Sequence, residues 1–372
     1  MLCYPDYDKS ILSIPASLLR HYGLEPGHKT LPLLDELLDS DPRNVVFMVF
    51  DGLGSSILEK HLGEGSFLRA NQRGELSSVF PPTTAAATVS LFSGLSPAEH
   101  GWLGWSLYFP ELDKNVNILP NTLAGTRDTP AADYHMAQRF MPYTTVLERI
   151  VQKTDGVVDA QHVSPYSAHR TKSLTELFGT VEAIGRKPGR HLLTAYWPEP
   201  DGALHRYGTG DEAVQELAGT IDVLLRELCR NLRDTLVVVT ADHGHTDTEY
   251  AFTTDCPELV ECLARPQSIE ARAANFFVKP ERRGPFETAF IERFGKEFLL
   301  LTKEQVLERG LFGPGVHHPR FAGFLGDYLA IATGKLSLDY ARPTYRGIYK
   351  SQHAGLTKEE LTVPFVAFQT RK

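Results

Sequence analysis

The feature that most restricts the fold of this 372-residue chain is a set of short apolar segments, each followed closely by polar residues. Residues 44–50 (NVVFMVF) end at Asp51, residues 191–196 (HLLTAY) precede an acidic loop, and residues 235–240 (TLVVVT) precede Asp242. Continuous apolar runs of this length are typical of strands that are buried on both faces of a parallel sheet. The sequence therefore predicts a buried parallel sheet whose strands end near acidic side chains.

Helical patterns alternate with these strands. Residues 211–232 carry leucines and an isoleucine at helical spacing, and residues 84–92 (TAAATVSLF) are typical of a helix that Gly94 ends. Further short strands are expected at residues 77–80 and 363–368. This alternation predicts an α/β fold with a doubly wound, mostly parallel sheet flanked by helices. Such sheets bind ligands at the carboxyl ends of their strands.

The pattern changes to shorter elements in the last third of the chain. Strands are expected at residues 274–278 and 298–301, and a helix at residues 286–294. A capping box formed by Thr302 and Gln305 is expected to open a further helix. We interpret residues 255–330 as a small α/β insertion in a catalytic domain that is formed by residues 1–254 and 331–372.

Composition and charge argue against several classes of function. The chain has 46 Asp and Glu against 38 Lys and Arg, and a net charge of −8 disfavours binding of a nucleic acid polymer. The apolar segments are too short to cross a bilayer, and the first ten residues (MLCYPDYDKS) do not resemble a signal peptide. We therefore expect a cytoplasmic protein with no membrane partner. Four cysteines match no metal or redox motif and are expected to be free thiols, namely Cys3, Cys229, Cys256 and Cys262.

The motif with the most specific chemistry is Asp242-His243-Gly244, which follows the predicted strand at residues 235–240. An adjacent carboxylate and imidazole can bind one metal ion only where the backbone turns sharply, and Gly244 permits such a turn. The alternative interpretation is an ordinary polar end of a strand. The motif alone does not decide between the two.

A second carboxylate and imidazole pair consists of Asp201 and His205, shortly after the predicted strand at residues 191–196. Residues four apart lie on the same side of one helical turn, so both side chains can face one ion. The alternative is a helix-capping Asp beside a histidine on the surface. His353, in a predicted loop, is a further candidate ligand, although an isolated loop histidine usually has no such role.

A third signal is the segment at residues 80–87 (FPPTTAAA), a rigid turn that leads into a predicted helix. A helix N-terminus offers free amides and a positive dipole, which suit a phosphate group. A metal ion bound to the hydroxyl of Thr84 would lower its pKa and make it a nucleophile. The alternative is an ordinary threonine at the N-cap of the helix.

The order of these motifs resembles the alkaline phosphatase superfamily, and within it the type I phosphodiesterase and nucleotide pyrophosphatase branch. The resemblance is carried by VFMVFDGLG, FPPTTAAATVSLFSGLSPAEHG, EPDGALHRYG, TADHGHTD and SQHAGLT, which are spread from residue 46 to residue 357. It implies a hydrolase of small phosphate esters with two similar divalent ions, usually zinc, and a phospho-threonine intermediate. By resemblance, one ion is held by Asp201, His205 and His353, and the other by Asp51, Thr84, Asp242 and His243.

The chain departs from the nucleotide-hydrolysing members of this branch directly after Thr84. Those members have a Phe that stacks on the nucleobase, whereas this chain has Ala85. Trp102, Trp105 or Tyr108 could form an aromatic wall instead, or could pack in the core. We therefore predict a phosphodiesterase-like hydrolase of phosphate esters. Two alternatives stay open, a phosphonoacetate-type C–P hydrolase and a non-catalytic protein that binds phosphorylated ligands through its metal ions.

Overall fold

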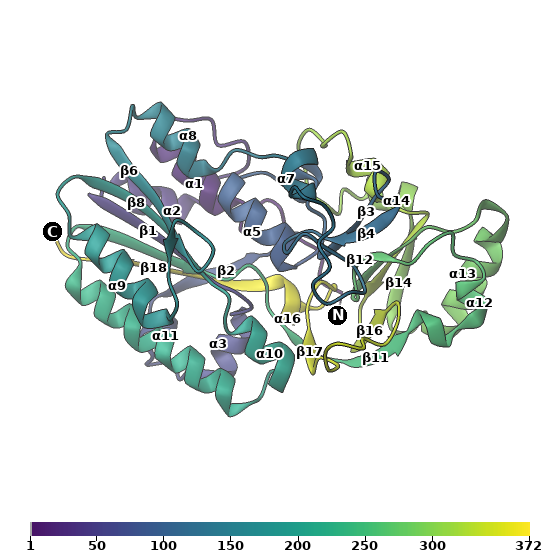
Figure 1. Ribbon diagram of the computed structural model, residues 1–372. Coiled ribbons are helices and arrows are strands. Elements are labelled where there is room, and N and C mark those ends of the chain that lie inside the picture. Colours follow the sequence, from purple (N-terminus) through teal and green to yellow (C-terminus); the bar gives the residue numbers. More distant parts are fainter. Residues whose placement is uncertain (1) are drawn as a thin grey trace.

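The three apolar segments form adjacent central strands of a seven-stranded sheet in the computed structural model, which describes residues 2–372 (Figure 1). The strands of this sheet lie in the order β2 (Gln72–Ser77), β18 (Thr362–Gln369), β9 (Thr235–Thr240), β1 (Asn44–Phe50), β8 (Arg190–Trp197), β6 (Val158–Ser164) and β7 (His169–Arg170). Strands β9, β1, β8, β6 and β7 are parallel to one another, and β18 is antiparallel to both of its neighbours, β9 and β2. The predicted mostly parallel α/β fold is confirmed.

The register of the central strands brings their carboxyl ends to one edge. Phe50 at the end of β1 lies opposite Trp197 of β8, and Val49 lies opposite Thr240 of β9. Each of these strands is therefore followed at the same edge by a segment that contains an acidic residue. This edge is where a doubly wound sheet is expected to bind its ligand.

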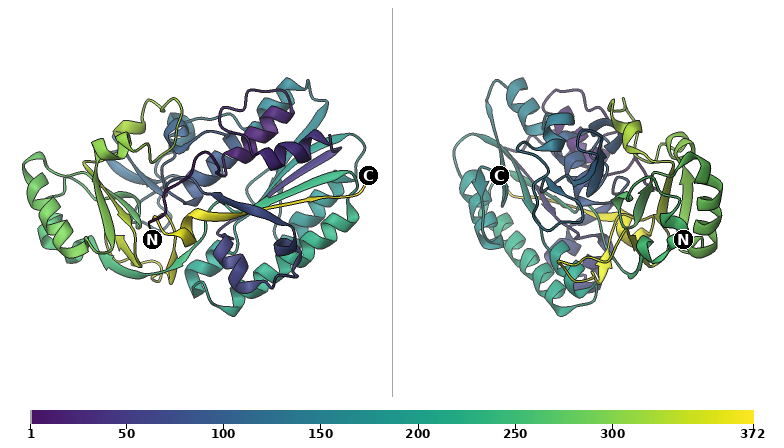
Figure 2. Two further views of the ribbon diagram at one scale, coloured as in Figure 1. Left: turned by 180° about the vertical axis from the view of Figure 1, so that it is seen from behind. Right: turned by 45° about the vertical axis from the view of Figure 1, so that its right-hand side comes forward.

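Helices cover both faces of this sheet (Figures 1 and 2). One face carries α1 (Ser13–His21), α2 (Pro32–Asp39), α5 (Thr84–Ser93) and α8 (Val146–Lys153), and the other carries α3 (Ser55–His61), α9 (Leu174–Gly185) and α11 (Glu212–Asn231). The predicted helices at residues 84–92 and 211–232 thus form. Gly94 ends α5 with a φ of 74°, a conformation that glycine adopts without strain. Shorter helices are α4 (Phe67–Ala70), α6 (Pro97–His100), α7 (Met136–Phe140) and α10 (Asp201–Tyr207).

One strand lies elsewhere than predicted. The sequence predicts a short strand at residues 77–80, but β2 ends at Ser77 and the segment after it is irregular. The Ser78 hydroxyl donates to the carbonyl of Asp242, so this segment packs against the end of β9 and not into a ladder. The true strand (QRGELS) is polar because it lies at the edge of the sheet, and a search for apolar runs therefore misses it.

A second seven-stranded sheet lies beside the first (Figure 1). Its order is β14 (Phe298–Thr302), β15 (Tyr328–Ala332), β13 (Ala273–Phe276), β12 (Ser268–Glu270), β3 (Ser106–Phe109), β4 (Lys114–Asn117) and β5 (Thr122–Leu123). It is accompanied by α12 (Pro257–Val260), α13 (Arg283–Phe294), α14 (Lys303–Glu308) and α15 (Phe321–Phe324), and by 3-10 turns at Thr253–Asp255 and Pro280–Arg282. The capping box of Thr302 and Gln305 forms at α14. This sheet also contains strands from outside residues 255–330. That residues 255–330 form a separate insertion therefore stays a proposal.

Two small ladders link the sheets. Strand β10 (Thr246–Asp247) pairs with β17 (Ser351–Gln352), and β11 (Glu249–Phe252) pairs with β16 (Leu336–Asp339). The chain continues through α16 (Lys358–Leu361) into β18, so the loop that holds His353 lies between both sheets. Within residues 2–372, no helix has the length and apolar character needed to cross a membrane. The four cysteines are free, as predicted.

A fully buried ion pair fixes the loop between the sheets. Arg272, at the turn between β12 and β13, donates from Nε and Nη2 to the two carboxylate oxygens of Glu360 in α16, at 2.6 and 2.7 Å. Glu360 also accepts the amide of Gly355 at 2.8 Å and the hydroxyl of Thr357 at 2.7 Å. The pair therefore ties the second sheet to the segment that contains His353.

We predict that Arg272→Met destabilises the protein strongly because the Glu360 carboxylate stays buried without its counter-charge. The free energy of unfolding in urea should fall by about 3–5 kcal/mol. Arg293→Met is the matched control, because Arg293 pairs with Glu258 at 3.4 Å while both side chains are about half exposed. That variant should lose less than about 1 kcal/mol. Equal losses in the two variants would contradict the role given to Arg272.

Candidate metal centre

Three carboxylates meet at the edge formed by the carboxyl ends of β1, β8 and β9. Asp51 follows β1, Asp201 begins α10 after β8, and Asp242 follows β9. The Asp201 amide donates to the backbone carbonyl of Asp51 at 3.0 Å, which joins the first two segments directly. Gly52 adopts a φ of 73° and donates its amide to Asp242 Oδ1 at 3.1 Å, which joins the third. A side chain at position 52 would press against the backbone of Asp201, since its Cβ would lie 3.1 Å from the Cα of that residue.

The first group of potential metal ligands surrounds the hydroxyl of Thr84 at the start of α5. Asp51, Asp242 and His243 form this group, with ligand atoms that lie within 4.8 Å of one another. Thr84 Oγ1 lies 3.3 Å from both carboxylate oxygens of Asp51 and 3.2 Å from Nε2 of His243. Nδ1 of His243 faces the carbonyl of Gly244 at 3.1 Å, which directs Nε2 toward the carboxylates.

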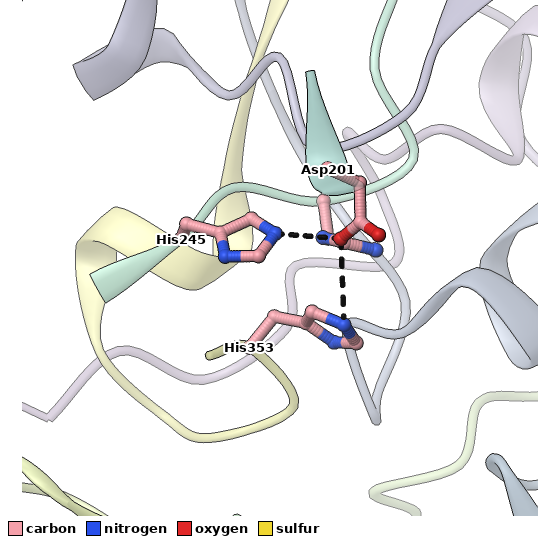
Figure 3. Close-up of side chains that lie close together, drawn as sticks. Asp201, His245 and His353 are labelled. Carbon is pink, nitrogen blue, oxygen red and sulfur yellow. Dashed lines mark hydrogen bonds and ion pairs between the residues drawn. The ribbon is translucent and has the colours of Figure 1, made fainter. Parts of the chain in front are cut away.

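The second group is centred on Asp201 and contains three imidazoles, those of His243, His245 and His353. Oδ1 of Asp201 lies 2.7 Å from Nε2 of His245 and 3.7 Å from Nε2 of His353. Figure 3 shows both imidazoles pointing toward this carboxylate. His205, one helical turn after Asp201 in α10, approaches the same oxygen at 3.3 Å. All seven residues named from the sequence are therefore brought together in or beside the two groups.

Negative charge in the first group controls the protonation of His243. Burial lowers the pKa of its imidazole, but the Asp242 and Asp51 carboxylates raise it more, to about 10. Burial and the nearby Asp51 also raise the pKa of Asp242 well above its ordinary value. The first group therefore retains protons that a bound cation would replace.

The pKa values in the second group shift in the opposite direction. Burial raises the pKa of Asp201, but His205 and His245 lower it more, to well below its ordinary value. Burial lowers the pKa of His245 to about 3 and that of His353 well below its ordinary value. The ionised carboxylate of Asp201 and the neutral imidazoles of His245 and His353 can therefore bind a divalent ion without first losing protons.

The residues present fit divalent metal ions. Oδ2 of Asp242 is fully buried and has no hydrogen-bond partner among residues 2–372, which is costly for a carboxylate unless a cation binds it. Within the same part of the chain, none of the three carboxylates is paired with a Lys or Arg. Carboxylate and imidazole groups together are typical ligands of zinc and similar ions.

Sequence reasoning missed two residues of this centre. His245 was left out of the predicted ligands, although it lies two residues after His243 with only a glycine between them. In an extended segment, side chains two apart point to the same side, and this signal could have identified it. Tyr196, near the end of β8, donates its hydroxyl to Asp51. Its position in an apolar strand gave no sign of this role.

The aromatic residues considered for a substrate wall have mixed positions. Trp102 is buried and donates its Nε1 to the carbonyl of Met141 at 2.9 Å. Tyr108 donates to Asp113 at 2.6 Å, and the guanidinium of Arg265 covers its ring at 3.8 Å. Trp105 is 44% exposed. The first two therefore have structural partners, and only Trp105 stays available for a wall.

Comparison with known proteins agrees with this arrangement. The sequence model described as "Type I phosphodiesterase / nucleotide pyrophosphatase" matches residues 45–284, which is more than half of the chain. That range contains Asp51, Thr84, Asp201, Asp242 and His243. No protein of curated function matches the sequence significantly.

Solved structures share the fold at low sequence identity. Murine ectonucleotide pyrophosphatase / phosphodiesterase 5 is 16% identical, with a TM-score of 0.64 over 87% of each chain. An inactive Thr-to-Ala variant of that protein, solved in complex with AMP, gives a TM-score of 0.62 over the same shares at 16% identity. Phosphonoacetate hydrolase from Sinorhizobium meliloti 1021, solved with phosphonoformate, is 16% identical, with a TM-score of 0.65 over 88% of this chain and 91% of that chain.

We predict that zinc binds the metal-free protein more tightly as the pH rises from about 7 to about 9. His243, with its pKa of about 10, must lose its proton before Nε2 can bind an ion. The gain approaches about tenfold per pH unit for each proton displaced and ends above the pKa. Isothermal titration calorimetry in buffers of different ionisation enthalpy measures both the affinity and the protons released. A pH-independent affinity without proton release would contradict the prediction, and His243→Gln should show a flatter profile.

Proposed function

Because this chain belongs to the type I phosphodiesterase / nucleotide pyrophosphatase family, we propose that it is a two-metal hydrolase of phosphate esters with Thr84 as its nucleophile. The observation that carries the proposal is the position of the Thr84 hydroxyl. It lies at the N-terminus of α5, 3.3 Å from the carboxylate of Asp51 and 3.2 Å from the imidazole of His243. A nucleophile next to potential metal ligands, at a helix end that favours anions, suits attack on a phosphate.

Two divalent ions, of which zinc is our first candidate, would be held by residues of the two groups. We assign Asp51, Thr84, Asp242 and His243 to one ion and Asp201, His205 and His353 to the other. His245 hydrogen-bonds the carboxylate of Asp201 and so orients it, in the way that outer partners of metal ligands commonly do. When bound, the ions would lower the pKa of the Thr84 hydroxyl and neutralise charge on the phosphoryl oxygens.

In the proposed first step, Thr84 Oγ1 forms a bond to phosphorus and the bond from phosphorus to the leaving oxygen breaks. The hydroxyl proton has an acceptor close by, since both oxygens of Asp51 lie 3.3 Å from Thr84 Oγ1. Tyr196 donates to the same carboxylate and holds it in place. The product of this step is a phospho-threonine.

In the second step, a water molecule attacks the phosphorus and the bond to Thr84 Oγ1 breaks, which returns the free hydroxyl and releases the product. The first amides of α5 and the positive end of its dipole stabilise the phosphoryl charge in both steps. The Thr84 hydroxyl therefore attacks phosphorus in the first step and is restored in the second. The N-terminus of α5 keeps it in one position during both steps.

A phosphonoacetate-type C–P hydrolase is the second candidate function. It is supported by the structural similarity to the phosphonoacetate hydrolase of Sinorhizobium meliloti, which covers most of both chains. The two activities are separated by incubating the zinc-loaded protein with phosphonoacetate and with bis-p-nitrophenyl phosphate. Release of phosphate from the first without cleavage of the second would favour the C–P hydrolase.

A non-catalytic binding protein is the remaining alternative. It would hold metal ions and phosphorylated ligands in the same place without turnover. Metal analysis together with a panel of nitrophenyl esters tests this alternative, since a protein loaded with about two ions per chain that cleaves none of them would support it. Turnover of any ester in proportion to metal content would reject it.

We predict that Thr84→Ala lowers kcat/KM for bis-p-nitrophenyl phosphate at least about 1,000-fold, because the attacking oxygen is lost. Metal content should be measured in the same preparation and should stay close to that of the wild type, since Asp51, Asp242 and His243 are retained. Thr83→Ala is the matched control, because it changes the adjacent threonine and should retain measurable turnover.

Acid quenching during turnover provides a direct test of the intermediate. Phosphate should be found on Thr84 in the wild-type protein by mass spectrometry and should be missing from the Thr84→Ala variant. Substantial activity in purified Thr84→Ala protein would reject the mechanism.

A further inference from the structure

Glu270, at the end of β12 in the second sheet, reaches the candidate site and has no part in the mechanism described above. Its Oε1 accepts the hydroxyl of Thr83 at 2.5 Å and the backbone amide of Trp105 at 2.7 Å. Thr83 is the residue directly before the proposed nucleophile and is 1% exposed. The carboxyl group of Glu270 therefore lies beside the start of α5, where the phosphate of a substrate would bind.

The backbone that presents Glu270 is strained. Ile269, directly before it, has a φ of 73°, which is a rare conformation for a β-branched residue. Gly104 makes room for it, because a Cβ at that position would lie 2.7 Å from Cγ2 of Ile269. Such strain persists only where the surrounding structure enforces it, and it is concentrated at functional sites. It directs the Glu270 carboxyl group toward α5.

The hydroxyl of Thr83 bonds to Glu270 and not to the first backbone amides of α5, which are the usual partners of a threonine at the N-cap. Thr83 occupies the N-cap position of α5, yet within residues 2–372 its side chain makes no capping hydrogen bond to the helix. Its hydroxyl is donated to Glu270 instead. The first amides of α5 are consequently not occupied by the Thr83 side chain, and the carboxyl group stands next to them.

The charge of Glu270 is not balanced by a basic side chain. Among residues 2–372, Glu270 forms no ion pair with a Lys or an Arg. Burial raises the pKa of Glu270 to about 7, while its hydrogen bonds from Thr83 and Trp105 and the nearby imidazole of His243 act to lower it.

We propose that Glu270 makes this site select phosphodiesters over phosphate monoesters and phosphonoacetate. A diester carries one negative charge, whereas a monoester carries about 1.5 to 2 at neutral pH. A fixed carboxylate close to the phosphoryl group repels the more highly charged substrate more strongly. This inference rests on the proposed function, and it decides between the substrate classes that the metal ligands alone leave open.

The test compares kcat/KM for bis-p-nitrophenyl phosphate and p-nitrophenyl phosphate at about pH 8.5, where Glu270 is ionised even with its pKa raised to about 7. The wild type should prefer the diester. In Glu270→Gln and Glu270→Ala, kcat/KM for the monoester should rise so that the diester preference falls roughly tenfold. Glu270→Asp keeps the charge and should keep most of the preference. Glu297→Gln is the control, since it changes a partly buried Glu that lies directly before β14, outside the candidate site.

A binding measurement separates failure of this inference from failure of the proposed function. Inorganic phosphate, a dianion at this pH, is titrated calorimetrically into zinc-loaded wild-type protein and Glu270→Gln. Its affinity should rise roughly tenfold in the variant, whether or not the protein cleaves any ester. An unchanged diester preference in both neutral variants, or an unchanged phosphate affinity in Glu270→Gln, would overturn the inference. A protein that cleaves no ester but shows the gain in phosphate affinity would reject only the proposed function.

Discussion

Mutual repulsion of three carboxylates at one sheet edge is the constraint on which the rest of the structure depends. Asp51, Asp201 and Asp242 come from three different strand ends, and no Lys or Arg within residues 2–372 neutralises them. Such an arrangement is costly in a buried site unless protons or cations lie among the carboxylates. The negative charge of these carboxylates also raises the pKa of His243, which lies 3.3 Å from Oδ2 of Asp242.

The second sheet fixes this centre from the other side. Arg272 and Glu360 hold the loop around His353, in which Ala354 adopts a strained φ of 91°. Because a non-glycine residue pays a steric cost in that region, the loop needs the hydrogen bond from Gly355 to Glu360 and the buried ion pair to keep its shape. Glu270 belongs to the same sheet, so one structural unit positions His353, a proposed metal ligand, and the carboxyl group to which we assign substrate selection.

The core elements could be predicted because burial on both faces leaves a clear pattern. Residues 45–50 and 236–239 are apolar, and both segments lie in central strands that are buried along their whole length. The edge strand β2 was misplaced because half-exposed polar residues carry no such pattern. The seven residues chosen for the site do converge. Glu270 could not be recognised, since its role depends on a strained residue and on contacts with Thr83 and Trp105 that are distant in sequence.

The central claim is that the two ligand groups hold two divalent ions around Thr84. Anomalous diffraction from crystals grown with zinc, with data collected on both sides of the zinc absorption edge, tests it most directly. We expect two strong peaks, one between Asp51, Thr84, Asp242 and His243 and the other between Asp201, His205 and His353. An absence of peaks at both groups, with zinc bound only elsewhere on the protein, would contradict the account.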